Sequence, residues 1–168
     1  MKDDAQSSRR ARVVVWLWSH LPVSGPAKSA IAWLANLRYA VGVAAIIPDG
    51  DGRVFVARHT YRSPGREWGL PGGWAKGRES LERALARELR EETGLDIVVD
   101  RLVTVQSGYA VPRMTVFFLA HVAGGTFRPS AEVSAYEYRS PSDLSGLLSG
   151  ERQVVTLALA ALPGAPGR

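Results

Sequence analysis

Acidic residues are concentrated in one stretch of 23 residues, from Gly73 to Leu95. Glu88 and Glu92 are four residues apart, and Glu91 follows Glu88 by three, so on a helix the three carboxylates would share one patch. Carboxylate oxygens, with waters and substrate phosphates, are the ligands that Mg²⁺ takes in proteins. The stretch therefore indicates a divalent metal site. A solvated, charged helix face is the alternative that helix chemistry alone leaves open.

The spacing of the apolar residues in the same stretch predicts the helix that would carry these carboxylates. Ser80 is suited to cap its amino end, and Gly94 suits a left-handed residue at its carboxyl end. Residues at i, i+3, i+4 and i+8 form one apolar face, namely Leu81, Ala84, Leu85 and Leu89.

This stretch resembles the signature of the Nudix hydrolases, G-x5-E-x7-R-E-U-x-E-E-x-G-U, in which U is a bulky aliphatic residue. Every fixed position is filled at the required spacing, by Gly73, Glu79, Arg87, Glu88, Leu89, Glu91, Glu92, Gly94 and Leu95. The resemblance implies hydrolysis of a phosphoanhydride bond in a nucleoside diphosphate linked to another moiety. It implies Mg²⁺ as the cofactor, with Mn²⁺ as an alternative ion.

The resemblance also assigns roles within the stretch. Glu88 and Glu92 are expected to bind the metal directly, and the carbonyl of Gly73 is expected to be a further ligand. Glu91 is expected to be a ligand, a partner of the ligands or the catalytic base. Glu79 and Arg87 are expected to pair and brace the loop against the helix, in support of catalysis.

The general base can also lie outside the signature. Glu132 is the leading candidate, because it opens a segment, EVSAYEYRSPSDL, that resembles one common in the family. Glu137 is the second candidate, with a solvent-facing position on a strand as the alternative interpretation.

Aromatic and arginine residues near the signature are candidates for substrate binding, since a base can stack on a ring and arginine can pair with phosphate. Packing or solvation is the alternative for each. His20, His59 and His121 lack metal-ligand spacing and are expected to be structural or surface residues. The substrate candidates are Trp68, Tyr61, Arg62, Arg66 and Tyr109.

Composition limits the class of protein. The chain has 168 residues, 46% of them hydrophobic and 22% charged, which is typical of one globular domain. It has no cysteine, so disulfides and thiolate sites are excluded, and we expect a cytoplasmic protein. The net charge of +5 comes without a long basic run or a nucleic-acid-binding module, so we expect a phosphorylated small molecule as the partner, not nucleic acid.

Residues 1–38 are predicted to form an extension outside the domain. Its tail ends at Arg12, and Val13–Trp18 is apolar but too short to span a membrane, for which about 20 residues are needed. A peripheral contact through Trp16 and Trp18 is the minority alternative, and residues 24–37 predict a helix. This apolar segment offers a homodimer a contact surface.

The Nudix domain is expected over residues 39–162, followed by a tail over 163–168. Its fold class is predicted as α/β, a Nudix-like α/β/α sandwich with a curved mixed β-sheet between helices. A hairpin is expected from residues 39–48 and 53–59 around the turn at Asp49–Gly52. Further strands are expected at 96–106, 114–122 and 133–138, a helix beginning at Ser140-Pro141, and a last helix over 151–162.

A domain of this fold that senses nucleotides without catalysis is the alternative function. The complete set of signature carboxylates favours the enzyme. No further motif selects among nucleoside triphosphates, oxidised nucleotides, nucleotide sugars and dinucleoside polyphosphates.

Overall fold

The computed structural model describes residues 16, 25–26, 39–108 and 111–162. Residues 39–168 are a unit separate from residues 1–38, and the fold below is that of residues 39–162. The described residues do not include Tyr109, the tail at 163–168 or most of residues 1–38, so the predictions for these parts lie outside them. The homodimer stays a prediction. Among the described residues, no helix is long and apolar enough to cross a membrane.

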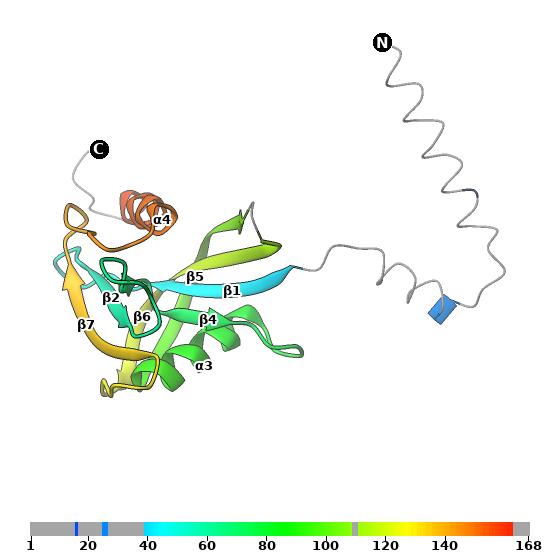
Figure 1. Ribbon diagram of the computed structural model, residues 1–168, viewed down its shortest axis with the longest axis horizontal. Helices are drawn as coiled ribbons and strands as arrows, with labels where there is room; N and C mark the ends of the chain where they lie inside the picture. The colour runs from blue at the N-terminus through cyan, green and yellow to red at the C-terminus, as the bar shows by residue number, and fades with distance from the viewer. Residues whose placement is uncertain (1–15, 17–24, 27–38, 109–110, 163–168) are drawn as a thin grey trace, which may run out of the picture. The chain divides into compact units, whose positions relative to one another are not determined.

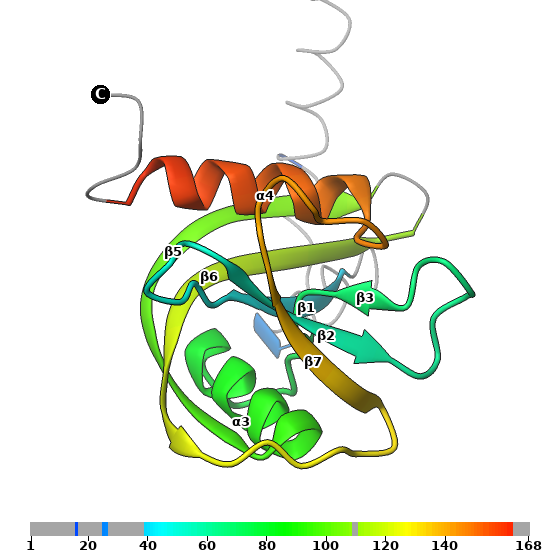
Figure 2. The same ribbon diagram turned by 90° about the vertical axis from the view of Figure 1, so that its left-hand side faces the viewer.

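The described part of the domain contains seven strands in two sheets and two helices (Figures 1 and 2). The first sheet has the order β4-β1-β6-β5, in which β1 and β6 are parallel and the other pairs antiparallel. The second has the order β3-β2-β7 and is antiparallel. The elements are β1 (Ala40–Ile46), β2 (Val54–His59), β3 (Trp68–Gly69), β4 (Gly72–Trp74), α3 (Leu81–Thr93), β5 (Leu95–Gly108), β6 (Arg113–Gly125), β7 (Val133–Arg139) and α4 (Ser149–Ala160).

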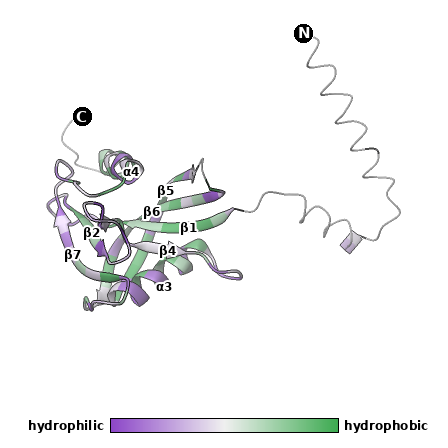
Figure 3. Cartoon of the chain, in the orientation of Figure 1, coloured by the Kyte–Doolittle hydropathy of each residue, from purple (hydrophilic) through white to green (hydrophobic). Residues whose placement is uncertain are grey.

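Strand β1 lies between two hydrophobic cores, which explains its nearly continuous apolar sequence. Val43 and Ala45 belong to the core that includes Leu85 of α3. Ala44 and Ile46 alternate with them and pack in the core of α4. Figure 2 shows α3 and α4 on opposite sides of the strands, and Figure 3 shows the apolar colouring of β1 between them. The predicted α/β class, with a mixed sheet between helices, is confirmed.

Helix α3 begins and ends where the sequence predicts. The Ser80 side chain accepts a hydrogen bond from the backbone N–H of Arg83, at 3.3 Å. Gly94 has a φ of 74°, and its N–H donates to the carbonyl of Arg90. These two caps fix the length of the helix, and its buried residues Ala84, Leu85 and Leu89 fix which face turns to the core.

Two predicted elements are wrong in detail. Strands β1 and β2 do not form a hairpin, because they belong to different sheets and share only the isolated bridge between Pro48 and Val54 at their turn. The turn chemistry at Asp49 was read correctly, but the chain crosses from one sheet to the other there. The helix expected at Ser140-Pro141 is a series of turns, and α4 starts later, at Ser149. Leu144 and Leu147 are nevertheless buried in the core of α4.

The close approach of β4 to β1 depends on Gly72, which gives the first prediction. A Cβ at this position would overlap the carbonyl oxygen of Val43, and the φ of 151° is one that side chains rarely adopt. We expect Gly72→Ala to destabilise the fold by about 2 kcal/mol or more, measured by thermal or denaturant unfolding.

Gly77→Ala is the matched control, because a Cβ there meets nothing within 4 Å. We expect it to change stability by less than about 0.5 kcal/mol. Equal effects of the two substitutions would show that β4 can shift away from β1 at no cost.

Candidate active site

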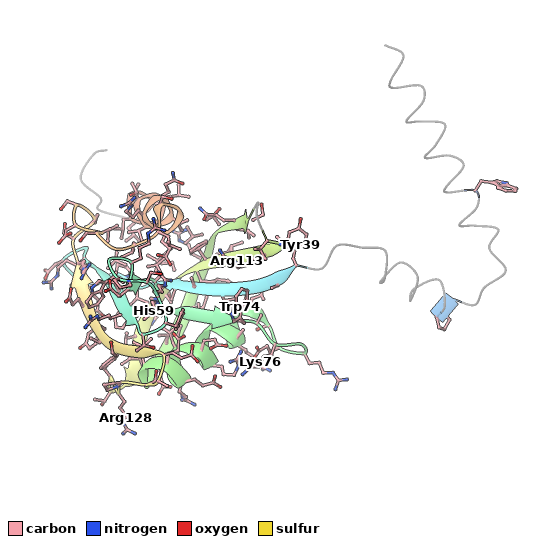
Figure 4. The ribbon with its side chains drawn as sticks, in the orientation of Figure 1. Tyr39, His59, Trp74, Lys76, Arg113 and Arg128 are labelled. Carbon is pink, nitrogen blue, oxygen red and sulfur yellow. The ribbon has the colours of Figure 1, made fainter. Side chains whose placement is uncertain are left out.

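A cavity of about 1120 Å³ opens between α3, the two sheets and the amino end of α4. Figure 4 marks four residues of its lining, namely His59, Trp74, Lys76 and Arg113. The cavity also brings together most of the residues that the sequence predicts for the site, namely Gly73, Glu88, Glu91, Glu92, Glu132, Tyr61, Arg62 and Arg66.

Arg87 is the central cation beside this cavity. Its Nε and Nη2 donate to the two carboxylate oxygens of Glu79, at 3.1 and 2.7 Å. Its Nη1 donates to Glu88, at 2.7 Å, and to Glu91, at 3.2 Å. Its Nη2 also donates to the backbone carbonyl of Trp74, at 3.1 Å. One guanidinium therefore links α3 to the end of β4 and to the loop before the helix.

The ion pair between Glu79 and Arg87, predicted from the sequence, is present. The hydrogen bonds from Arg87 hold the pKa of the Glu79 carboxyl down at about 2, with help from the backbone N–H of Lys76. The carboxylates around Arg87 raise its pKa further above its usual range. Both groups stay charged at neutral pH, so the ion pair between the loop and the helix persists there.

Glu88 lies directly against the backbone of β4. A Cβ placed on Gly73 would sit 2.6 Å from the Oε2 atom of Glu88, so a side chain at position 73 would displace the carboxylate. The absence of a side chain at Gly73 thus allows a carboxylate of α3 to reach the backbone of the strand, which is the arrangement that a site of mixed carboxylate and carbonyl ligands needs.

Glu92 is a buried carboxylate that lacks a full set of partners. Its residue is 4% exposed, and its Oε2 atom has no hydrogen-bond partner among the described residues. Burial, reinforced by the negative charges of Glu132 and Glu88, raises the pKa of Glu92 to about 7. A buried oxygen without a donor is costly unless a cation or a proton occupies it.

Glu91 is placed differently from the other two signature carboxylates. It is half exposed and pairs with Arg87, at 3.2 Å, and with Lys76, at 3.8 Å. No three His, Cys, Asp or Glu side chains in the described part of the chain converge closely enough to form a metal cage by themselves. Glu88 and Glu92 supply oxygen donors of the type that Mg²⁺ takes together with waters and substrate oxygens, and the backbone of Gly73 lies against Glu88.

The structure distinguishes the two candidates for the general base that lie outside the signature, Glu132 and Glu137. Glu132 lines the cavity, and its charge acts on Glu92 and on Tyr61. Glu137 lies on β7, outside the cavity lining, and pairs with Arg139 at 2.8 Å. Its exposed position agrees with the alternative interpretation, a solvent-facing residue on a strand.

Two substrate candidates have structural partners. Arg62 lines the cavity, but its guanidinium donates to Glu151, at 2.9 Å, and to the carbonyl of Trp68, at 3.2 Å. It therefore ties the loop after β2 to the start of α4 and is not a free phosphate ligand. Trp68 lies outside the cavity lining and stacks with Arg139, whose Cζ is 4.2 Å from the ring centre. Tyr61 and Arg66 line the cavity and are exposed.

Several residues that line the cavity have no clear signal in the sequence. Arg113 and Thr115 alternate on β6 and so share a face, but the apolar run that follows them masked this signal. Lys76 sits three residues after the first glycine of the signature. His59, expected to be structural, is 1% exposed, and burial lowers its pKa to about 4, so it lines the cavity as a neutral ring.

Comparison with known proteins agrees with this geometry. A family model described as the NUDIX domain matches residues 38–158. A MutT-like protein from Streptomyces ambofaciens is 33% identical over 107 residues, which cover 64% of this chain and 68% of that protein. An NAD-capped RNA hydrolase, NudC, from Vibrio atlanticus is 28% identical over 109 residues, covering 62% of this chain and 40% of that protein, so the match spans less than half of the relative.

A solved structure is similar over most of the domain. The crystal structure of an ADP-ribose pyrophosphatase from Streptococcus suis superposes with a TM-score of 0.64 and 27% sequence identity. The match covers 74% of this chain and 92% of that chain.

The burial of Glu92 predicts a conflict between stability and metal binding. Because the pKa of Glu92 is raised from 4.5 to about 7 in the folded chain, stability without metal falls as the pH rises from 4.5 to 7. Glu92→Gln removes that loss. In EDTA at pH 8 we expect it to stabilise the chain by up to about 3 kcal/mol, measured by denaturant unfolding.

Glu82→Gln, an exposed substitution on the same helix, is the control and should change stability by less than about 0.5 kcal/mol at every pH. Adding Mg²⁺ should then stabilise the wild type and not Glu92→Gln. A Gln variant less stable than the wild type in EDTA at pH 8 would mean that the protein already satisfies this carboxylate.

Proposed function

We propose that this chain, which belongs to the Nudix hydrolase family and is a pyrophosphohydrolase of that family, hydrolyses a phosphoanhydride bond with the help of Mg²⁺. The substrate is a nucleoside diphosphate linked to another moiety. The observation that carries the proposal is the buried oxygen of Glu92, which has no partner in the described chain and lies beside Glu88 in a cavity of substrate size.

The donor set for the metal is Glu88, Glu92 and the carbonyl of Gly73. Bound there, Mg²⁺ would neutralise diphosphate oxygens and lower the pKa of an attacking water. Glu91 can join the set when it exchanges Arg87 and Lys76 for the ion, with Mn²⁺ as an alternative to Mg²⁺. Glu79 and Arg87 act through position, because their ion pair holds the loop and Glu88 in place.

Glu132 is proposed as the general base. It lies on the loop before β7, lines the same cavity and is close enough to Glu92 for its charge to act on that carboxylate. It is exposed and has no cationic partner among the described residues, so it can accept a proton from an attacking water. Glu91 remains the second candidate for this role.

Cationic side chains on the cavity wall would contact the diphosphate of the substrate. Arg66 and Arg113 make no ion pair with other described residues, and Lys76 has only the long contact with Glu91. Because relatives named for NAD-capped RNA and for ADP-ribose share this domain, a diphosphate with a group on each side is the substrate form that we favour.

A substrate panel with Mg²⁺ tests the function. It would contain nucleoside triphosphates, oxidised nucleotides, nucleotide sugars, ADP-ribose and dinucleoside polyphosphates, with products identified by chromatography. We expect cleavage at a phosphoanhydride bond that EDTA abolishes and that Glu88→Gln lowers by orders of magnitude. Nucleotide binding without turnover of any member would favour the alternative, a sensing domain.

Glu132→Gln tests the base. We expect kcat to fall about 100-fold or more with little change in KM, and the rise of rate with pH to disappear, because the amide cannot accept a proton. Glu137→Gln is the matched control, since that carboxylate lies outside the cavity, and it should leave kcat unchanged. A normal turnover and pH–rate profile for Glu132→Gln would transfer the role to another residue, Glu91 first.

A further inference from the structure

A row of side chains crosses all four strands of the first sheet on the face turned to α4. The register pairs Trp74 of β4 with Gly42 of β1, Gly42 with Thr115 of β6, and Thr115 with Gln106 of β5. Residues paired in this way project from the same face of a sheet. All four line the cavity, and we name them the cross-strand row.

The cross-strand row lies on the other face of the sheet from the metal carboxylates. Glu88 packs against Gly73, whose neighbour in the sheet is Val43 in the core of α3. Gly42 and Ala44 face the opposite way, and Gly150 of α4 lies close to the Gln106 side chain. The cavity therefore bends around the edge strand β4. The carboxylates of α3 lie on one side of this strand, and the cross-strand row lies on the other.

The chemistry of the row is that of a site for a planar, uncharged group. At one end of the row Trp74 is 51% exposed, so the face of its indole ring is open to stacking by a planar group. Gly42 has no side chain and leaves backbone as a floor. Neither the Thr115 hydroxyl nor the Gln106 amide hydrogen-bonds to any other described side chain or backbone group.

The dimensions agree with such an occupant. Neighbouring strands are about 4.8 Å apart, so three steps place the Cα atoms of Trp74 and Gln106 about 14 Å from each other. The two side chains approach from the ends, over Gly42 and Thr115. Arg113 lies two residues before Thr115 on the same face and so supplies a cation next to the row but outside it.

We propose that the cross-strand row binds the nucleobase of the substrate, with the ring against Trp74 and over Gly42. This inference rests on the proposed function and names the part of the substrate that this face selects. The Gln106 amide offers an acceptor next to donors, the pattern that pairs with adjacent donor and acceptor groups on a base edge. The Thr115 hydroxyl bonds to a further polar atom of the base. The diphosphate then passes over the edge at Gly72 and Gly73 to the carboxylates of α3.

Binding of nucleoside 5′-monophosphates tests the site without turnover. Isothermal titration calorimetry in Mg²⁺ would compare AMP, GMP, CMP and UMP with ribose 5-phosphate, which lacks only the base. We expect the wild type to bind at least one nucleotide tenfold or more tighter than ribose 5-phosphate. Trp74→Ala and Gln106→Ala should each remove most of that advantage and leave the affinity for ribose 5-phosphate unchanged.

Gly42→Val should remove the same advantage, because the new side chain would fill the space over Gly42 that we propose for the base. A Cβ at Gly42 lies 3.5 Å or more from every neighbour, so the first carbon of the new side chain fits, and the rest extends into the cavity. Ser107→Ala is the control, an exposed position adjacent to Gln106 on the opposite face of β5. It should bind nucleotides like the wild type. Trp74→Ala keeps the backbone carbonyl that Arg87 uses and removes an exposed ring, so its fold should be intact.

The outcomes separate this inference from the proposed function. Wild-type binding of ribose 5-phosphate as tight as that of every nucleotide overturns the base site, as does a full nucleotide advantage in Trp74→Ala and Gln106→Ala. A base-dependent affinity that these variants abolish, in a protein that hydrolyses no member of the substrate panel, supports the site and contradicts the proposed function.

Discussion

The rest of the site depends on the hydrogen bonds that the guanidinium of Arg87 donates. Three carboxylates on neighbouring turns and loops would repel one another, and only a cation that reaches all of them can hold them within one region. Arginine can do so because its donors form a fixed planar fork that serves several acceptors at once. By also binding the carbonyl of Trp74, Arg87 fixes the end of β4 against α3.

The attachment of β4 to α3 requires that the edge of the first sheet carry no side chain at two positions. Once β4 is held against α3, Glu88 reaches the strand only because Gly73 has no side chain, and β4 approaches β1 only because Gly72 has none. An edge strand without bulk at these two positions lets a single cavity continue from one face of the sheet to the other. A diphosphate can therefore lie at the edge with its two ends in different environments.

The parts of the site that depend on local sequence could be predicted, and those that depend on distant pairings could not. The caps of α3 follow from Ser80 and Gly94, and the resemblance to the Nudix signature implies the pair between Glu79 and Arg87, which lie only eight residues apart. The ion pair of Arg62 could not be predicted, because its partner, Glu151, is 89 residues away. The cross-strand row was invisible to sequence patterns, because it exists only through the parallel pairing of β1 with β6 and the antiparallel pairing of β5 with β6.

The unequal surroundings of the signature carboxylates give a physical reason to rank them as metal ligands. A cation that binds Glu91 must first displace Arg87 and Lys76, so part of its binding free energy is lost in breaking those contacts. A cation that binds Glu92 displaces no donor from Oε2 and instead relieves the cost of a buried charge. Without metal the fold thus carries the cost of a buried charge, which the proposed metal binding would remove. Glu92 is therefore the position at which we propose the strongest metal affinity, and it is the carboxylate on which the charge of Glu132 acts.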